Sequence, residues 1–314
     1  MHYLIHHNTR FRYSEPVTES VMELRMYPRT DGMQRCWRFK LLTSPSARLT
    51  EYRDYLGNTV HFFDIPRQHK QLTITAEAVV EVGAFPALPD ALPDDAWAEL
   101  DARTARGEFW ESLHPGERTA PSAALAAFAR ELDVRRRGDP LSLLRELNTQ
   151  LYNAFDYDQE TTTVDSTIDD AIEARRGVCQ DFTHVLAALV RGLGIPCRYV
   201  SGYLYHEKSY QDRSVPDATH AWAEAWLPSL GWIGFDPTNN ILAEGRHIRV
   251  AVGRDYGDVP PTHGVFKGDA ESELEVAVRV EQTEPPSQTE ELLPVVGWAS
   301  QDEANLQAQM QQQQ

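Results

Sequence analysis

A glycine, a cysteine and an apolar helical stretch follow one another along the chain, and this run constrains the fold most. Gly177 allows a tight turn into a helix, and Gly194 and Pro196 end that helix. The apolar residues after Cys179 recur at helical spacing: Phe182, Val185, Leu186, Leu189 and Leu193. Cys179 is therefore expected at a helix N-terminus, where unpaired N–H groups and the helix dipole favour a thiolate.

A candidate base and a carboxylate to orient it lie on two expected strands. Small and large residues alternate from residue 219 to residue 227, which is strand periodicity, and a return strand follows at 232–236. If the loop is 228–230, Asp236 shares a face with His220, one diagonal step away. A loop longer by one residue would place the two on opposite faces. Each signal alone has a structural explanation, but a cysteine, a histidine and an aspartate in this order favour a nucleophilic triad.

The same runs resemble the bacterial transglutaminase-like core, a group within the papain-like cysteine enzyme superfamily. Residues 250–256 resemble it too, and the N-terminal part resembles the β-rich region that precedes this core in bacterial members. The resemblance implies Cys179 as nucleophile, His220 as general base and then acid, and Asp236 as the orienting carboxylate. Its motifs are Gly177–Phe182, Gly194–Tyr203, Ala218–Trp222 and Phe235–Asn239.

The resemblance informs the mechanism and leaves the substrate open. Members hydrolyse peptides, deamidate glutamine or join glutamine to amines, always through an acyl-enzyme. We expect a cysteine peptidase or amidase that acts on a peptide or protein amide and needs no cofactor or metal. The alternatives are a protein-glutamine transglutaminase or deamidase, and an inactive relative that serves as a peptide-binding or scaffold module.

The donors for the reaction's oxyanion are less defined than the triad. The backbone N–H of Cys179 is available by position. A side chain from Tyr157, Gln180 or Trp222 could supply the second donor, and the sequence does not choose among them. His184 follows Cys179 by five residues, so on a helix it points some 140° away, and we expect a structural or hydrogen-bonding role for it.

Composition excludes several classes of function. The 314 residues, 41 % hydrophobic and 25 % charged, fit a globular protein. A net charge of −17 argues against nucleic acid and anionic membranes as partners. The start has no signal-peptide pattern, no run approaches a membrane span, and three cysteines make no disulfide framework. We therefore expect a cytoplasmic protein, whose oligomeric state the sequence leaves open.

The order of expected elements predicts an α+β fold. Residues 1–83 read as a β-sandwich with a hairpin turn at Gly57-Asn58, and its function is open between a substrate-orienting wall and a structural cap. Residues 84–120 read as a linker and helical connection. Residues 121–280 form the expected core, a helix bundle carrying Cys179 packed on an antiparallel sheet, with a last strand at 273–280. Residues 281–314 read as a disordered Gln-rich tail.

Finer patterns locate the helices and the N-terminal histidines. Thr167 with Asp170 resembles a helix N-cap. His2, His6 and His7 are expected to be surface residues of a strand, because no further metal ligands accompany them. The other helices are expected at Asp95–Glu111, Pro121–Leu132 and Leu141–Phe155, where apolar residues lie three or four apart.

Overall fold

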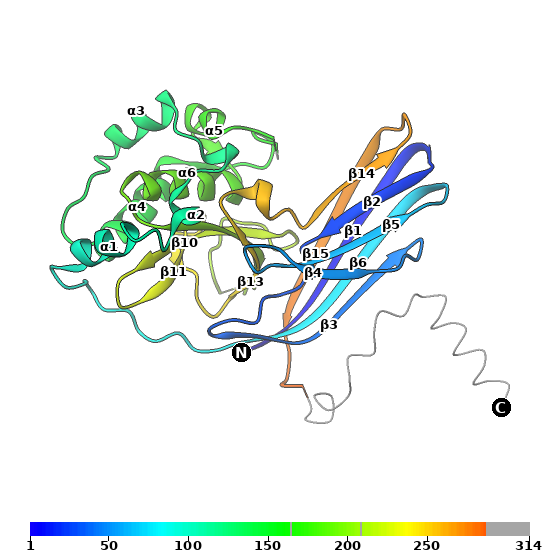
Figure 1. Cartoon of the computed structure of the whole chain (residues 1–314), viewed down its shortest axis with the longest axis horizontal. Helices are drawn as coiled ribbons and strands as arrows, with labels where there is room; N and C mark the ends of the chain where they lie inside the picture. Colours follow the sequence, from blue (N-terminus) through cyan, green and yellow to red (C-terminus); the bar gives the residue numbers. More distant parts are fainter. Residues whose placement is uncertain (164, 208, 287–314) are drawn as a thin grey trace.

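The chain forms a helix-and-sheet core beside a β-sandwich, as the α+β prediction required (Figure 1). This computed structural model describes residues 1–163, 165–207 and 209–286. Most of the expected tail, from residue 287 onward, lies outside the described residues, and residues 281–282 still belong to a strand. Among the described residues, no helix combines the length and the apolar character needed to cross a membrane.

The sandwich consists of two antiparallel four-stranded sheets whose inner faces share one core. Its inward side chains include Tyr3, Ile5 and Ile74 from the first sheet, and Leu24 and Phe63 from the second. They alternate with outward residues, as a pleated strand requires. The first sheet has the order β15 (Ser272–Gln282), β1 (His2–Val17), β6 (His69–Val82), β3 (Gln34–Ser44). The second has the order β14 (Thr262–Lys267), β2 (Glu19–Leu24), β5 (Thr59–Ile65), β4 (Thr50–Arg53).

Two strands from the end of the described chain complete the sandwich. β15 pairs with β1 from Tyr3 opposite Gln282 to Tyr13 opposite Ser272, and β14 pairs with β2. Apart from residues 281–282, both segments lie in the range 121–280 that was expected to form the core, but their pairing places them with residues 1–83. The reason is physical: alternation predicts that a segment is a strand, but it does not specify the partner.

The core sheet is antiparallel and carries the predicted register. Leu227 lies opposite Gly231 and Ala223 opposite Phe235, so the loop is 228–230 as the diagonal pairing of His220 and Asp236 required. Ser229 and Gly231 have positive φ values of 61° and 75°, which close this short turn. The strand order is β12 (Ile241–Leu242), β11 (Gly231–Asp236), β10 (His220–Leu227), β9 (Cys197–Leu204), β13 (His247–Gly253).

Helices cover one face of this sheet, and they bury a shared apolar core with it (Figure 1). Leu147, Phe182 and Val185 pack there with Ala223 and Phe235 of the sheet. The helices are α1 (Ala96–Thr104), α2 (Trp110–Leu113), α3 (Ala123–Glu131), α4 (Pro140–Ala154), α5 (Ile168–Ala174) and α6 (Cys179–Gly192). Short pieces connect them: the 3₁₀ turns at Glu117–Thr119 and Tyr256–Asp258, and the parallel pair β7 (Asp156–Tyr157) and β8 (Arg176–Gly177).

The helix boundaries follow the capping residues of the sequence. Thr167 and Asp170 form the expected capping box at the start of α5, and Gly194, with φ of 76°, follows the end of α6. The helix expected at 95–111 is two helices instead, α1 and α2. Gly107, with φ of 77°, lies in the turn that separates them, because a right-handed helix cannot continue through that conformation.

Two side-chain amides join the sandwich to the edge strand β13 of the core sheet. The amide of Asn58 donates to the carbonyl of Val252 over 2.9 Å and accepts from its N–H over 2.8 Å. Gln34 makes the same pair of bonds with the backbone of Arg249, at 2.8 and 2.7 Å. Each amide therefore satisfies a backbone donor and a backbone acceptor that the edge strand would otherwise leave open.

The N-terminal histidines also reflect this contact. His6 is partly exposed beside Glu77, at 3.3 Å. His7 is buried, with Nδ1 2.9 Å from the hydroxyl of Tyr203 on β9, and burial lowers its pKa to about 4. The expectation of a surface position is therefore wrong for His7, because this face of β1 packs against the core.

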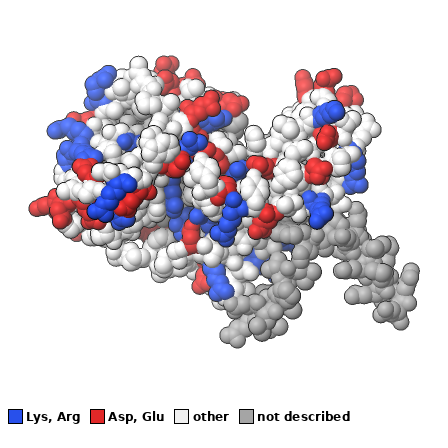
Figure 2. Space-filling model, in the orientation of Figure 1, with Lys and Arg blue, Asp and Glu red and all other residues white. Residues whose placement is uncertain are grey.

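Charged side chains of both signs are interspersed over the face seen in Figure 2. The net charge of −17 thus comes from an excess of Asp and Glu over Lys and Arg across the whole chain, 47 against 30. On that face the charge pattern is typical of a solvated surface and does not single out a binding patch.

Asn58→Leu should destabilise the protein, because Leu cannot satisfy the buried N–H and carbonyl of Val252. The loss of unfolding free energy is expected at about 1–3 kcal/mol for each buried group left without a partner. Urea unfolding of the full chain measures it. Asn153→Leu is the matched control, since Asn153 is exposed near the end of α4. An equal loss in both variants would contradict the proposed role of the Asn58 amide.

Candidate active site

Cys179 is the first residue of α6, where the sequence placed it. Its half-buried side chain packs against Tyr199, Ala221 and Ala251 on the helix-covered face of the sheet. A side chain at position 177 would collide with the carboxylate of Asp181, so glycine is required there. The first turn of α6 thus needs a glycine two residues before the cysteine for steric reasons.

The carboxylate of Asp181 fixes the start of α6. One of its oxygens accepts from the N–H of Val178 over 2.8 Å and from the hydroxyl of Thr162 over 2.7 Å. Burial nevertheless raises the pKa of Asp181, because these bonds only partly offset the loss of water. Asp181 therefore acts on the position of Cys179 through the backbone of the helix.

His220 and Asp236 meet at the adjoining ends of β10 and β11. The Nε2 atom of His220 lies 2.8 Å from Oδ2 of Asp236. Asp236 is fully buried, and its Oδ1 atom accepts from the N–H groups of Thr238 and Asn239 at 3.0 and 3.2 Å. The side-chain amide of Asn239 donates to Oδ2 at 2.9 Å. The turn after β11 thus wraps its own backbone around the carboxylate.

The charge state of His220 follows from this contact. Burial disfavours the imidazolium, but the charge and hydrogen bond of Asp236 outweigh it, and contact with Cys179 adds to them, so the pKa of His220 rises to about 10. The same ion pair holds the pKa of Asp236 well below its usual range despite burial. Because folding raises the pKa of His220 from 6.5, its stabilisation is complete below about pH 6.5 and is lost towards pH 10.

The second ring nitrogen of His220 faces the thiol. Nδ1 of His220 has no hydrogen-bond partner within standard distance among the described residues. Cys179 is nevertheless close enough to raise the pKa of His220. One imidazole therefore links the carboxylate on one side with the thiol on the other. The three residues that the sequence proposed as a triad are brought together in that order.

A second histidine, His247 at the start of β13, also binds Asp236. Its Nε2 atom lies 3.1 Å from Oδ2, and burial lowers its pKa. Sequence reasoning missed His247, because an isolated histidine before an apolar strand carries no distinctive spacing. It lies three residues before the run 250–256, which was the nearest available signal.

These three side chains are also the group that could hold a metal ion among the described residues. One ligand atom each of His220, Asp236 and His247 lies within 4.8 Å of the others. Two imidazoles and a carboxylate are ligands that zinc accepts. The same atoms already bond one another, so a metal would have to displace the contacts that orient His220.

The oxyanion candidates differ in their distance from the thiol. Burial, and then the charge of nearby Cys179, raise the pKa of Tyr157 to about 12, so its hydroxyl keeps its proton and can donate. Gln180 is buried beside Cys179 at the start of α6. Trp222 belongs to a different cluster, with Val200 and Val252 on the other face of the sheet. Tyr157 and Gln180 thus lie near the thiol, and Trp222 stacks on the ring of His220 with centroids 6.2 Å apart.

His184 has the hydrogen-bonding position expected for it. Its Nε2 atom accepts from the N–H of Tyr256 over 3.0 Å, and burial lowers its pKa to about 3. The imidazole is therefore neutral, and the nitrogen that would act as a base is occupied by the backbone.

Two parts of the chain match known families. Residues 3–81 match the bacterial transglutaminase-like N-terminal region, and residues 126–237 match the transglutaminase-like superfamily. The second match spans Cys179, His220 and Asp236, while His247 lies beyond it. The two matched ranges correspond to the sandwich strands and to the helix-and-sheet core.

Two mycobacterial relatives extend the similarity over nearly the whole chain, and a third relative matches half of it. A protein of Mycobacterium leprae is 34 % identical over 275 residues, which are 87 % of this chain and 96 % of the relative. A Mycobacterium tuberculosis protein is 36 % identical over 294 residues, 88 % of this chain and 92 % of the relative. A protein-glutamine gamma-glutamyltransferase of Pseudomonas aeruginosa is 30 % identical over 161 residues, 50 % of this chain and 23 % of that protein.

A solved structure shares the fold. A protein of Cytophaga hutchinsonii, provisionally named a cysteine protease, superimposes with a TM-score of 0.69 at 22 % identity. The superposition covers 91 % of this chain and 92 % of that one, so the sandwich and the core occur together in both. With both parts matched in sequence and the fold shared over 91 % of its length, the chain belongs to the bacterial transglutaminase-like family.

Proposed function

We propose that this protein is a cysteine-dependent enzyme that transfers the acyl group of a peptide or amide bond through a thioester. Cys179 is the nucleophile, His220 the general base and acid, and Asp236 the orienting carboxylate. The observation that carries the proposal is the 2.8 Å bond between His220 Nε2 and Asp236, which leaves Nδ1 for the thiol. A nucleophile, a base and an orienting group in series are what covalent acyl transfer requires.

In the first half-reaction the sulfur attacks the carbonyl carbon of the amide. A C–S bond forms and the carbonyl π electrons move to oxygen, which the N–H of Cys179 and a second donor stabilise. The C–N bond then breaks, and the His220 imidazolium gives its Nδ1 proton to the leaving amine. Tyr157 is our choice for the second donor, because it lies near the thiol and keeps its proton.

In the second half-reaction a water molecule resolves the thioester. Neutral His220 accepts a proton from the water as its oxygen attacks, the C–S bond breaks, and the carboxylic acid leaves. Asp236 stays ionised and holds Nε2–H throughout, so Nδ1 alternates between base and acid without a change of ring orientation. We favour hydrolysis of peptide or protein amides, since water is the default acceptor and transamidation requires a site that excludes it.

Transfer from glutamine to an amine is the second candidate. The identity to a protein named as a protein-glutamine gamma-glutamyltransferase supports it, although the match covers 23 % of that protein. Both candidates use the same acyl-enzyme, and they differ only in the acceptor that reaches the thioester.

We also place the enzyme in the cytoplasm. Cys36, Cys179 and Cys197 are all free thiols. A reducing compartment keeps such thiols reduced and suits a catalytic cysteine, which supports this location.

Iodoacetamide should alkylate Cys179 rapidly at pH 6, because the imidazolium of His220, with a pKa of about 10, persists beside the thiol. Peptide mass spectrometry reads the rate at each cysteine. Cys36 and Cys197 are internal controls, since burial raises the pKa of both thiols to about 12. In His220→Ala the labelling of Cys179 at pH 6 should fall about 10²-fold, as for an unassisted thiol with a pKa of about 8.5. Slow labelling in the unmodified protein would instead favour the inactive binding module.

Asp236→Asn should lower the pH at which His220 titrates from about 10, because the carboxylate charge that offsets burial is lost and only the contact with Cys179 still favours the imidazolium. NMR of ¹³C-labelled histidine follows the titration, and His220→Gln assigns the resonance by its loss. Asp139→Asn is the matched control: Asp139 is a buried helix cap, and Asn caps a helix equally well. A His220 resonance that titrates at the same pH in Asp236→Asn would exclude the carboxylate as its partner.

Incubation with glutamine-containing peptides and a fluorescent primary amine should produce new peptide termini faster than amine adducts. Mass spectrometry counts both products, an ammonia assay detects deamidation, and Cys179→Ala gives the background. Amine incorporation that outruns cleavage would transfer the assignment to transglutaminase activity. Ammonia release without cleavage or adducts would identify a deamidase.

A further inference from the structure

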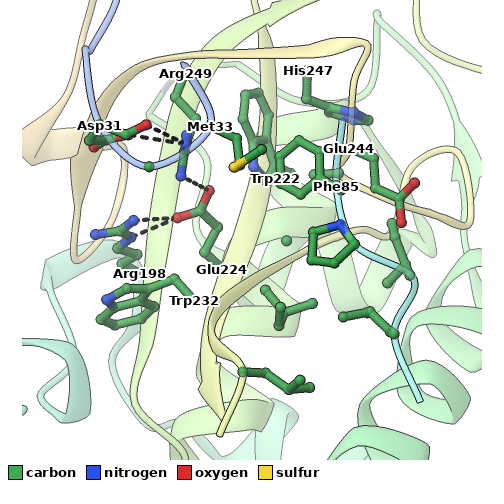
Figure 3. Close-up of a pocket in the computed structure, with 18 of the residues that line it drawn as sticks. Asp31, Met33, Phe85, Arg198, Trp222, Glu224, Trp232, Glu244, His247 and Arg249 are labelled. Carbon is green, nitrogen blue, oxygen red and sulfur yellow. Dashed lines mark hydrogen bonds and ion pairs between the residues drawn. The ribbon is translucent and has the colours of Figure 1, made fainter. Parts of the chain in front are cut away.

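A cavity of about 530 Å³ lies beside the core sheet (Figure 3). Glu224 of β10 lines it, whereas Ala223 and Ala225 on either side pack with the helices. Because neighbouring side chains of a strand point to opposite faces, the cavity lies on the face that the helices do not cover. The loop at 31–33 of the sandwich and the segment at 85–88 form further walls. Its volume is within the range of small-molecule sites, roughly 300–1,000 Å³, so it has room for a few side chains.

Much of the wall consists of apolar side chains that water still reaches. Met33 keeps 43 % of its surface exposed, and the others are half-buried. An occupant that removes this surface from water is favoured by the hydrophobic effect. The side chains come from the loop, the segment at 85–88 and the strands β11 and β12: Met33, Phe85, Leu88, Trp232, Ile233 and Leu242.

The buried charges of the wall already have partners. Glu224 bonds Arg198 at 2.6 and 2.8 Å, while Arg249 lies 3.6 Å from Glu224 and 3.0 Å from Asp31. Two cations thus face two anions, and these pairs are drawn as dashed lines in Figure 3. Glu244 is exposed at the rim. A charged occupant would enter this wall without a counter-ion, so the cavity favours an uncharged one.

The end of β15 lies close to the rim of this cavity. Gln282, the last residue of β15, is paired with Tyr3 of β1, and Figure 1 shows this end of β15 near the N-terminus. The hydroxyl of Tyr3 donates to the carbonyl of Gly245 over 2.8 Å. Gly245 directly follows the rim residue Glu244. One tyrosine side chain therefore spans the distance from the end of β15 to the rim.

The order of strands gives a similar distance to the opposite wall. β3 is three strands away from β15 in the first sheet, and neighbouring strands lie about 4.8 Å apart. The carbonyl of Met33, just before β3, accepts from the N–H of Gly83 over 2.6 Å, where the chain leaves β6 towards residues 85–88. The wall at Met33 is thus roughly 15 Å from the end of β15.

The sequence that follows β15 contains a short apolar run. Residues 292–298 read Leu-Leu-Pro-Val-Val-Gly-Trp, with Glu290 and Glu291 before them and Asp302 and Glu303 after them. The run carries no charge, and it lies outside the described residues. Ten residues lead from Gln282 to Leu292, and ten extended residues span up to about 33 Å. The run is therefore within reach of the whole cavity.

From these observations we propose that the cavity is the docking site of residues 292–298 of the same chain. The apolar side chains of this segment lie against Phe85, Leu88 and Trp232 and cover the face of the core sheet that the helices leave open. A short connection gives the segment an effective concentration of about a millimolar at the cavity, so weak contacts are sufficient. The docking goes beyond the proposed acyl transfer and does not depend on it.

Fluorine NMR of the full chain labelled with 5-fluorotryptophan tests the docking, and Trp298→Phe assigns the resonance of Trp298 by its loss. This resonance should differ from that of a synthetic peptide of residues 288–302. Its shift between H₂O and D₂O should be small, because the docked indole is shielded from solvent. The docked form should outnumber the released form at least threefold. A resonance at the position of the peptide, with the full solvent shift, would overturn the proposal.

Matched variants of the tail test its chemistry. Val295→Asp places an unpaired charge in the apolar cavity and should lower the ratio of docked to released form at least tenfold. Gln301→Asp adds the same charge outside the segment and should change the ratio less than twofold. An unchanged ratio in Val295→Asp, or an equal fall in both variants, would contradict the docking.

A second pair of variants tests the cavity. Leu88→Gln makes the wall polar and should release Trp298, whereas Ala87→Gln, at an exposed neighbour that is not a wall residue, should not. Circular dichroism checks that both variants keep the fold. A ratio in Leu88→Gln equal to that of the unmodified chain would place the segment elsewhere and overturn the proposal.

Photocrosslinking identifies the contact without altering the cavity. Trp298→p-benzoylphenylalanine is irradiated in a mixture of ¹⁵N-labelled and unlabelled chains, and mass spectrometry maps the products. Cross-links should reach residues 31–33 or 85–88 and join residues of one isotope only. Gln312→p-benzoylphenylalanine is the control and should give at least fivefold fewer of them. Products that join the two isotopes would show docking between copies, and they would overturn the same-chain assignment, as would the absence of cross-links to the wall. These readouts use no catalytic activity, so a failure here is distinguishable from a failure of the proposed function.

Discussion

One buried carboxylate organises the end of the core where the proposed triad lies. Asp236 is fully buried and accepts hydrogen bonds from two imidazoles, a side-chain amide and two backbone N–H groups. A buried charge is tolerated only when such donors replace water, and removing one partner leaves the charge uncompensated. The ends of β10, β11 and β13 therefore converge on one atom group. The orientation and the charge of His220 both follow from that convergence.

The three residues of the proposed triad could be predicted from sequence because the patterns that locate them are local. A glycine followed by apolar residues at helical spacing predicts the start of the helix that carries Cys179. The length of one three-residue loop determines whether His220 and Asp236 share a face of the sheet. His247 was not accessible, since it reaches Asp236 from a strand that does not pair with β11. Its role depends on sheet order, and alternation in a single segment contains no information about order.

The parts that sequence reasoning did not find all combine distant segments. A cavity of about 530 Å³ beside the core sheet is lined by the loop at 31–33, the linker at 85–88 and four strands of the core. None of these segments has a distinctive sequence motif. In the sequence, Gln34 and Asn58 are ordinary polar residues of a β region. Their role is visible only in the structure, where their amides bond the edge strand β13. Their placement makes the sandwich a cover for that edge. This supports the structural-cap interpretation of residues 1–83.

The position of β14 and β15 late in the sequence affects how the sandwich folds during synthesis. β1 and β2 leave the ribosome well before their outer partners, which follow about 240 residues or more later. During synthesis both early strands therefore keep an open hydrogen-bonding edge, the kind of surface that captures other chains. The helix-and-sheet core has contacts that lie closer in sequence, so it can fold before β14 and β15 are made. The nascent protein thus carries a risk of aggregation at β1 and β2 until β15 and β14 pair with them.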